Sequence, residues 1–138
     1  MASVSDYREL KVWQEALALA ELVYGVTQRF PADERFGLIS QVRRAVVSVP
    51  SCIAEGNARS STRDYLRFLS MACGSLAEVE TQLVLSARLG YLPESDNDEL
   101  MLKLRGVHKL LHALKRALSR KDTVPSSPFP IPRSRSSN

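Results

Sequence analysis

The chain has 138 residues, enough for one domain with its own hydrophobic core. Hydrophobic residues make up 44% of it but aromatic residues only 7%, a profile typical of packed helices rather than sheets. The 19 Lys and Arg against 15 Asp and Glu give a formal net charge of +4, which permits a polyanionic partner without requiring one.

The sequence also argues against several cellular settings. No apolar run approaches the roughly 18–20 residues that cross a bilayer, and the N-terminus "MASVSDYREL" has no apolar signal core. Cys52 and Cys73 fit no metal or redox spacing, which favours free thiols in a reducing compartment. We therefore expect a soluble, cytoplasmic protein.

Residues 8–29 predict a first helix. Its apolar residues recur every three or four positions, and we expect the face they share to be buried: Leu10, Trp13, Leu17, Ala20, Tyr24 and Thr27. Pro31 ends this helix, because proline disfavours the helical conformation at Phe30 and suits the opening of a new helix.

A second helix is predicted over residues 33–57, with a buried stripe of Ile39, Val42, Val46, Val49 and Ile53. Pro50 lies inside it, where proline removes one backbone hydrogen bond at a cost of roughly 3 kcal/mol. Because Ile53 stays in phase with Val46 and Val49, we expect one helix kinked at Pro50 rather than two helices. The kink either wraps the helix around the core or shapes a subunit interface, and both explanations stay open.

The third and fourth helices are predicted over residues 61–89 and 95–121. Ser61 with Asp64, and Ser95 with Asp98, have the spacing of a capping box, and Gly90 marks the end of the third helix. The buried stripe of the third helix is Tyr65, Leu69, Ala72, Leu76, Val79 and Leu83. That of the fourth is Leu100, Leu104, Val107, Leu111, Leu114 and Leu118.

Four amphipathic helices with short loops and no strand pattern predict an all-α fold, an antiparallel up-down four-helix bundle. This domain covers residues 1–122. Residues 123–138 hold four prolines and repeated serines, so we expect a disordered tail there.

Outward-facing bases suggest a nucleic-acid partner. Residues 100–121 contain no acid, whereas a surface helix usually mixes charges of both signs. A row of bases suits the phosphates of a nucleic acid, and the alternative is a solvated face that complements the helix dipole. The candidate nucleic-acid-binding residues are Arg44, Arg59, Arg63, Arg67, Arg105, Lys109, Arg116 and Arg120.

A second set of outward residues is small or apolar. Glycine within a helix costs about 1 kcal/mol relative to alanine, and close approach of another helix would explain it there. We therefore predict an oligomer interface made by Ala18, Leu22, Val26, Val47, Gly74 and Gly106.

Catalytic and metal sites are not predicted. His108 and His112 have the i,i+4 spacing of zinc ligands, but there is no glutamate between them and no third ligand nearby, so we expect surface histidines. Glu78 and Glu80 fall on different helix faces, and "AEGNA" lacks the lysine and hydroxyl of a phosphate-binding loop. We expect no enzyme, no cofactor and no metal.

Several motifs resemble a known family. The segments "RELKVWQEALALA", "FPADERFGLISQVRRAVVSVPSCIAEG", "STRDYLRFLSMACGSLAEVETQL" and "LGYLPE" are similar to the four-helix bundle proteins also called 23S rRNA intervening-sequence proteins. The resemblance spans about residues 8–93. The family segment S-x-P-S-x-I-A-E-G falls on Ser48, Pro50, Ser51, Ile53, Ala54, Glu55 and Gly56, and its paired arginines fall on Arg43 and Arg44.

This resemblance implies a cytoplasmic bundle that assembles as a ring, typically a homopentamer, and binds nucleic acid. Two departures, Cys52 for a frequent asparagine and Ala58 for a frequent glycine, leave the fold intact. Related bundles are accessory proteins of diversity-generating retroelements, where they bind a reverse transcriptase and its RNA or DNA. A basic bundle that binds nucleic acid, structured RNA in particular, and a protein-interaction scaffold therefore both stay open.

Overall fold

The computed structural model describes residues 6–123, with side chains described up to residue 120. This part of the chain is helical and contains no strand. Four long helices follow one another: α1 (Lys11–Thr27), α2 (Leu38–Asn57), α3 (Thr62–Arg88) and α4 (Glu94–Thr123). Two short 3-10 helices, η1 (Tyr7–Glu9) and η2 (Ala32–Glu34), precede α1 and α2. Residues 124–138 of the expected tail lie outside the described residues.

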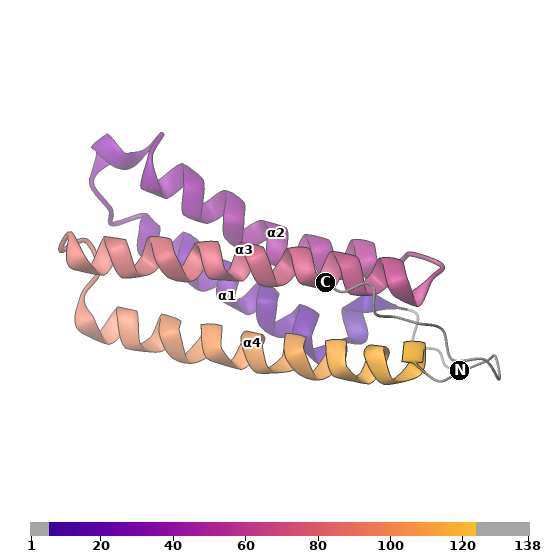
Figure 1. Ribbon diagram of the computed structural model, residues 1–138. Helices are drawn as coiled ribbons and strands as arrows, with labels where there is room; N and C mark the ends of the chain where they lie inside the picture. Colours follow the sequence, from indigo (N-terminus) through magenta and orange to yellow (C-terminus); the bar gives the residue numbers. More distant parts are fainter. Residues whose placement is uncertain (1–5, 124–138) are drawn as a thin grey trace, which may run out of the picture.

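The long helices form the predicted four-helix bundle, running alternately up and down (Figure 1). Each helix packs against two others, because α1 and α3 both contact α2 and α4, and the contact between α2 and α3 is the most extensive. The centre is filled by aliphatic side chains, each of which stabilises the fold by roughly 1.5–3 kcal/mol on burial. The fully buried ones include Leu19, Val23, Val46, Ile53, Leu69, Val79, Leu83, Val107 and Leu111. Within residues 6–123, no helix is both long enough and apolar enough to cross a membrane.

Helix α2 continues through Pro50, as the phase of its apolar residues predicts. The helix is unbroken from Leu38 to Asn57, and Val46, Val49 and Ile53 are fully buried on one face. Pro50 itself is buried. The two halves of α2 therefore pack as one element.

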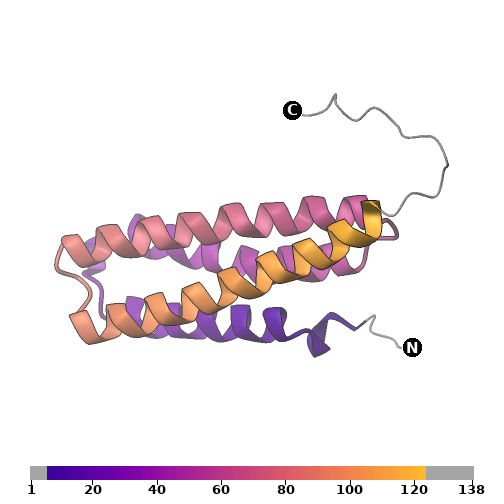
Figure 2. The same cartoon turned by 60° about the horizontal axis from the view of Figure 1, so that its bottom comes forward.

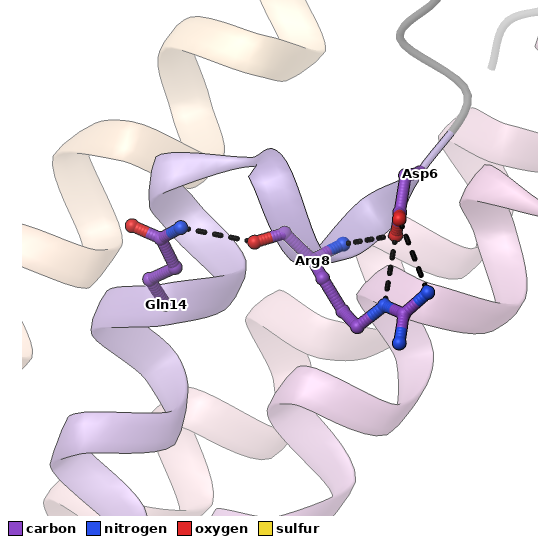
Figure 3. A network of polar contacts seen from close by, with 3 residues as sticks. All are labelled: Asp6, Arg8 and Gln14. Atoms are coloured by element: carbon purple, nitrogen blue, oxygen red, sulfur yellow. Dashed lines mark hydrogen bonds and ion pairs between the residues drawn. The ribbon is translucent and has the colours of Figure 1, made fainter.

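The start of α1 differs from the prediction, because Tyr7–Glu9 form a separate 3-10 turn and Leu10 is extended. Figure 3 shows the local bonds that stabilise this turn. The Asp6 carboxylate accepts hydrogen bonds from the Arg8 backbone N–H (3.0 Å) and guanidinium (3.1 Å), which lowers the pKa of Asp6. Gln14 Nε2 donates to the Arg8 carbonyl at 2.9 Å. The prediction of a continuous helix from residue 8 was therefore wrong.

The buried face of α1 is also turned relative to the prediction. Leu17 and Tyr24, expected in the core, are 38% and 42% exposed. The core takes Ala20 and Thr27, as predicted, together with Val12, Ala16, Leu19 and Val23, which the prediction left out. The reason is that the segment "LALAELVYGV" is apolar on nearly all sides, so its periodicity does not single out one face.

Helix α2 begins at Leu38 rather than near residue 33. Pro31 opens only the short η2, and Gly37 departs from helical geometry with φ −107° and ψ −113°. The Glu34 carboxylate accepts a hydrogen bond from the Leu38 N–H at 3.0 Å and another from the Tyr91 hydroxyl at 3.0 Å. Glu34 thus stabilises the first turn of α2 and links it to the loop before α4.

The ends of α3 follow the prediction, whereas the start of α4 does not. The Ser61 hydroxyl accepts a hydrogen bond from Asp64 N–H at 3.1 Å, and Gly90 has φ +83° after the last turn of α3. Helix α4, however, begins at Glu94, and Asn97 N–H already donates to the Pro93 carbonyl at 3.0 Å. Ser95 therefore lies inside the first turn and is not the capping residue.

Candidate nucleic-acid interface

Bases from several elements meet near one end of the bundle. The turn between α2 and α3 and the C-terminal end of α4 lie at this end, as Figures 1 and 2 both show. The exposed or partly exposed bases of the α2–α3 turn, α3 and α4 at this end, which we call the basic end, are Arg59, Arg63, Arg67, Lys115, Arg116 and Arg120. The up-down topology thus unites arginines that lie some 50 residues apart in the sequence.

The opposite end carries the α1–α2 and α3–α4 connections and is rich in acids. We call this group the acidic end: Asp33, Glu34, Glu94, Asp96, Asp98 and Glu99. Arg29, Arg35 and Arg88 also lie there, and Arg29 forms an ion pair with Asp96. The positive potential of the molecule is therefore concentrated at the basic end.

The remaining predicted bases lie away from the basic end. Arg105 and Lys109 are exposed in the middle of α4, and Arg44 is exposed in the half of α2 nearer the acidic end. The structure therefore groups five of the predicted residues, Arg59, Arg63, Arg67, Arg116 and Arg120, and leaves the other three along the sides.

The two adjacent arginines of α2 have different surroundings. Arg43 Nε donates to Thr27 Oγ1 at 2.9 Å, and its guanidinium lies 4.5 Å from the ring centroid of Tyr24. Arg43 thus joins α2 to the end of α1, whereas Arg44 is exposed. Of this pair, Arg44 is the more exposed cation.

The last turns of α4 form an open, shallow hollow. Its lining combines cations with two further polar groups: His112, Lys115, Arg116, Ser119 and Arg120. Lys115 and Ser119 were missed by the sequence analysis, which sought only residues directly opposite the leucines. Lys115 lies three residues after His112 and Ser119 lies three residues after Arg116, so a search for hydrogen-bond donors at helical spacing from these two residues would have found both.

The predicted interface residues lie on all four helices. Ala18, Leu22 and Val26 on α1 are half-buried rather than fully outward, and the last two pack against the core. Val47 is 42% exposed on α2. A Cβ built on Gly74 or Gly106 would meet no heavy atom within 4 Å, so nothing in the monomer fills the space beside these glycines.

The histidines and cysteines form no metal centre in the described residues, where no group of three His, Cys, Asp or Glu side chains could hold an ion. His108 and His112 stack with ring centroids 4.3 Å apart. Partial burial, followed by the nearby His108, Lys115 and Arg116, lowers the pKa of His112. Cys52 and Cys73 are free, and burial raises the pKa of the Cys52 thiol.

These residues thus form an up-down four-helix bundle with a basic and an acidic end, and this defines the class of protein. Within that class, the chain belongs to the 23S rRNA-intervening sequence protein family, whose profile matches residues 8–113. The resemblance noted in the sequence is thereby confirmed.

The fold is shared by a solved structure. It is described as a protein with unknown function from the S23 ribosomal protein family of Bacteroides thetaiotaomicron. Its TM-score is 0.69 at 21% sequence identity, over 76% of this chain and 98% of that chain. At this identity the likeness shows the fold alone. The comparison with curated proteins found no match.

Proposed function

We propose that this protein is a non-enzymatic, cytoplasmic helical bundle that binds the phosphate backbone of nucleic acid, structured RNA in particular, through its basic end. The single observation that supports this proposal most is the separation of charge between the two ends of the bundle. Six bases gather around the end of α4 and the start of α3, where the nearby acids among the described side chains are Glu55 and Asp64. The start of α1 adds two acids and two bases and so no net charge: Asp6, Arg8, Glu9 and Lys11.

Such an arrangement suits a polyanion for two physical reasons. Each phosphate neutralised by a Lys or Arg releases condensed counterions, which makes binding favourable at low salt. The acidic end is repelled by the same polyanion, so the bundle meets it with the basic end forward. Binding of this kind recognises backbone shape rather than base sequence.

Charge reversal at one end only tests this proposal. The variant Arg63→Glu/Arg116→Glu should bind a fluorescently labelled RNA hairpin more than about tenfold more weakly than the wild type, because two phosphate contacts become repulsive. The matched control is Arg35→Glu/Arg88→Glu, with the same charge change at the acidic end, and it should lose far less affinity. Equal losses in both variants would contradict the proposal.

The assembly state belongs to the same proposal. A ring uses two different patches of each subunit, because its contacts run head to tail. Such patches are offered by Ala18, Leu22, Val26 and Gly106 on α1 and α4, and by Val47 and Gly74 on α2 and α3. A homopentamer, as the family resemblance implies, would repeat the basic end around one rim.

A second candidate function is a protein-interaction scaffold, such as the accessory subunit of a diversity-generating retroelement reverse transcriptase. Exposed apolar side chains near the acidic end favour it: Phe36 is 88% exposed, Leu89 50% and Leu85 46%. A partner that stays bound after nuclease treatment and at high salt would support the scaffold over direct nucleic-acid binding.

A further inference from the structure

Phe68 lies under the basic end, in the second turn of α3, and is only 6% exposed. Close helix packing fixes its position. A Cβ on Gly56 of α2 would lie 2.9 Å from Phe68 Cβ and 2.9 Å from Tyr65 Cδ1, so glycine permits α2 and α3 to meet there. Asn57 Nδ2 also donates to the Tyr65 hydroxyl at 3.2 Å. The ring of Phe68 is therefore part of a packed junction.

Two arginines of the basic end lie over this one ring. The guanidinium carbon of Arg59, from the α2–α3 turn, lies 4.6 Å from the ring centroid, and that of Arg67 lies 4.7 Å from it. Attraction between each cation and the ring holds both guanidiniums beside it.

The ion pairs of these arginines are loose. Arg59 lies 3.9 Å from the Glu55 carboxylate and Arg67 lies 3.5 Å from that of Asp64, and all four side chains are at least 44% exposed. Exposed pairs at such distances contribute little to stability. A phosphate can therefore replace either carboxylate at small cost.

We propose that Phe68 is a positioning residue that holds Arg59 and Arg67 as a clamp for the phosphate groups of a nucleic-acid backbone. This inference rests on the proposed function and adds a specific phosphate site to it. Contact with the ring uses no hydrogen bond, so the guanidinium N–H groups can still donate to phosphate oxygens. Because the ring orders both side chains before binding, less conformational entropy is lost when the phosphates arrive.

A double-mutant cycle tests the clamp. Phe68→Leu keeps an apolar side chain in the junction but removes the ring, and it should weaken binding of an RNA hairpin about three- to tenfold. Phe68→Tyr keeps the ring and should restore the affinity to near that of the wild type. In an Arg59→Gln/Arg67→Gln background, Phe68→Leu should have no further effect. The control Phe36→Leu removes the ring on which Arg35 stacks at the other end and should change nothing.

Thermal unfolding of each variant separates lost positioning from lost fold. The inference is overturned if Phe68→Leu leaves RNA affinity unchanged, or if it lowers the affinity equally with and without the two arginines. Equal losses would mean that Phe68 acts only through the general stability of the bundle.

A readout without RNA separates this inference from the proposed function. In NMR spectra of the wild type, inorganic pyrophosphate should shift the Nε–H signals of Arg59 and Arg67, and Phe68→Leu should reduce these shifts. If the hairpin does not bind but pyrophosphate does so, the proposed function fails while the clamp stands. If pyrophosphate causes no shift at these arginines, the clamp is overturned.

Discussion

At the scale of single residues, Gly56 sets how closely α2 and α3 approach. A Cβ at this position would lie 2.9 Å from atoms of both Phe68 and Tyr65. We therefore predict that Gly56→Ala lowers the free energy of unfolding by about 1–3 kcal/mol, the usual cost of overpacking. Denaturant unfolding measures this change.

The matched control is Gly25→Ala in α1, where an added Cβ meets nothing within 4 Å. Alanine should stabilise this helix by up to about 1 kcal/mol, because it has the higher helix propensity. The explanation of Gly56 is wrong if both substitutions change stability in the same direction.

His112 should make stability depend on pH. Its pKa is lowered in the folded chain, so between the ordinary and the lowered pKa the unfolded chain binds the proton and the folded chain does not. His112 therefore makes its full contribution to the free energy of unfolding above its ordinary pKa. This contribution is lost as the pH falls from the ordinary pKa to the lowered one. Thermal midpoints from neutral to mildly acidic pH measure the effect.

The variant His112→Gln carries no titrating group at this position. Its thermal midpoint should fall less on acidification than that of the wild type. Identical pH profiles for the two proteins would show that His112 does not carry the effect.

At the scale of the helices, two serines that share the same capping pattern have different roles. Ser61 accepts a hydrogen bond from the Asp64 N–H, whereas Ser95 lies within the first turn of α4. Ser61→Ala should therefore lower the free energy of unfolding by about 1 kcal/mol, and Ser95→Ala should change it by less than about 0.5 kcal/mol. Chemical denaturation measures both variants. A larger loss of unfolding free energy in Ser95→Ala than in Ser61→Ala would contradict the assignment of Ser61 as the capping residue.

The helices that could be predicted well are those with one clear apolar face. The stripes of α2, α3 and α4 lie in the core much as their spacing predicts, and the phase of Val49 and Ile53 correctly carried α2 through Pro50. The face of α1 could not be predicted, because both of its flanks are apolar. Its start and that of α2 depend on bonds made by Asp6 and Glu34, whose partners the periodicity does not reveal.

The candidate site was predicted in its chemistry but not in its geometry. The sequence identified Arg59, Arg63, Arg67 and Arg116 as outward bases, and only the up-down arrangement brings them to one end. The sequence also predicted Arg44 as a nucleic-acid-binding residue, although Arg44 lies nearer the acidic end. The role of Phe68 beneath two guanidiniums depends on side-chain contacts across the α2–α3 turn.

At the scale of the whole molecule, we predict an assembly larger than a monomer. Val47 is exposed, so Val47→Glu should reduce the mass of the assembly in solution without lowering the thermal midpoint of the subunit. Phe36→Glu, at an exposed position just before α2, should leave the assembly intact. Native mass spectrometry decides this, and a wild-type protein that is a monomer at every concentration would contradict the predicted interface.

The central claim is that the basic end binds a nucleic-acid backbone, and the salt dependence of RNA affinity tests it most directly. The logarithm of the association constant should fall linearly with the logarithm of salt concentration. For Arg63→Gln/Arg116→Gln the slope should be smaller by about 1 for each lost phosphate contact, while Arg35→Gln/Arg88→Gln should keep the wild-type slope. An affinity that does not change with salt, or a slope that falls equally in both variants, would contradict the account.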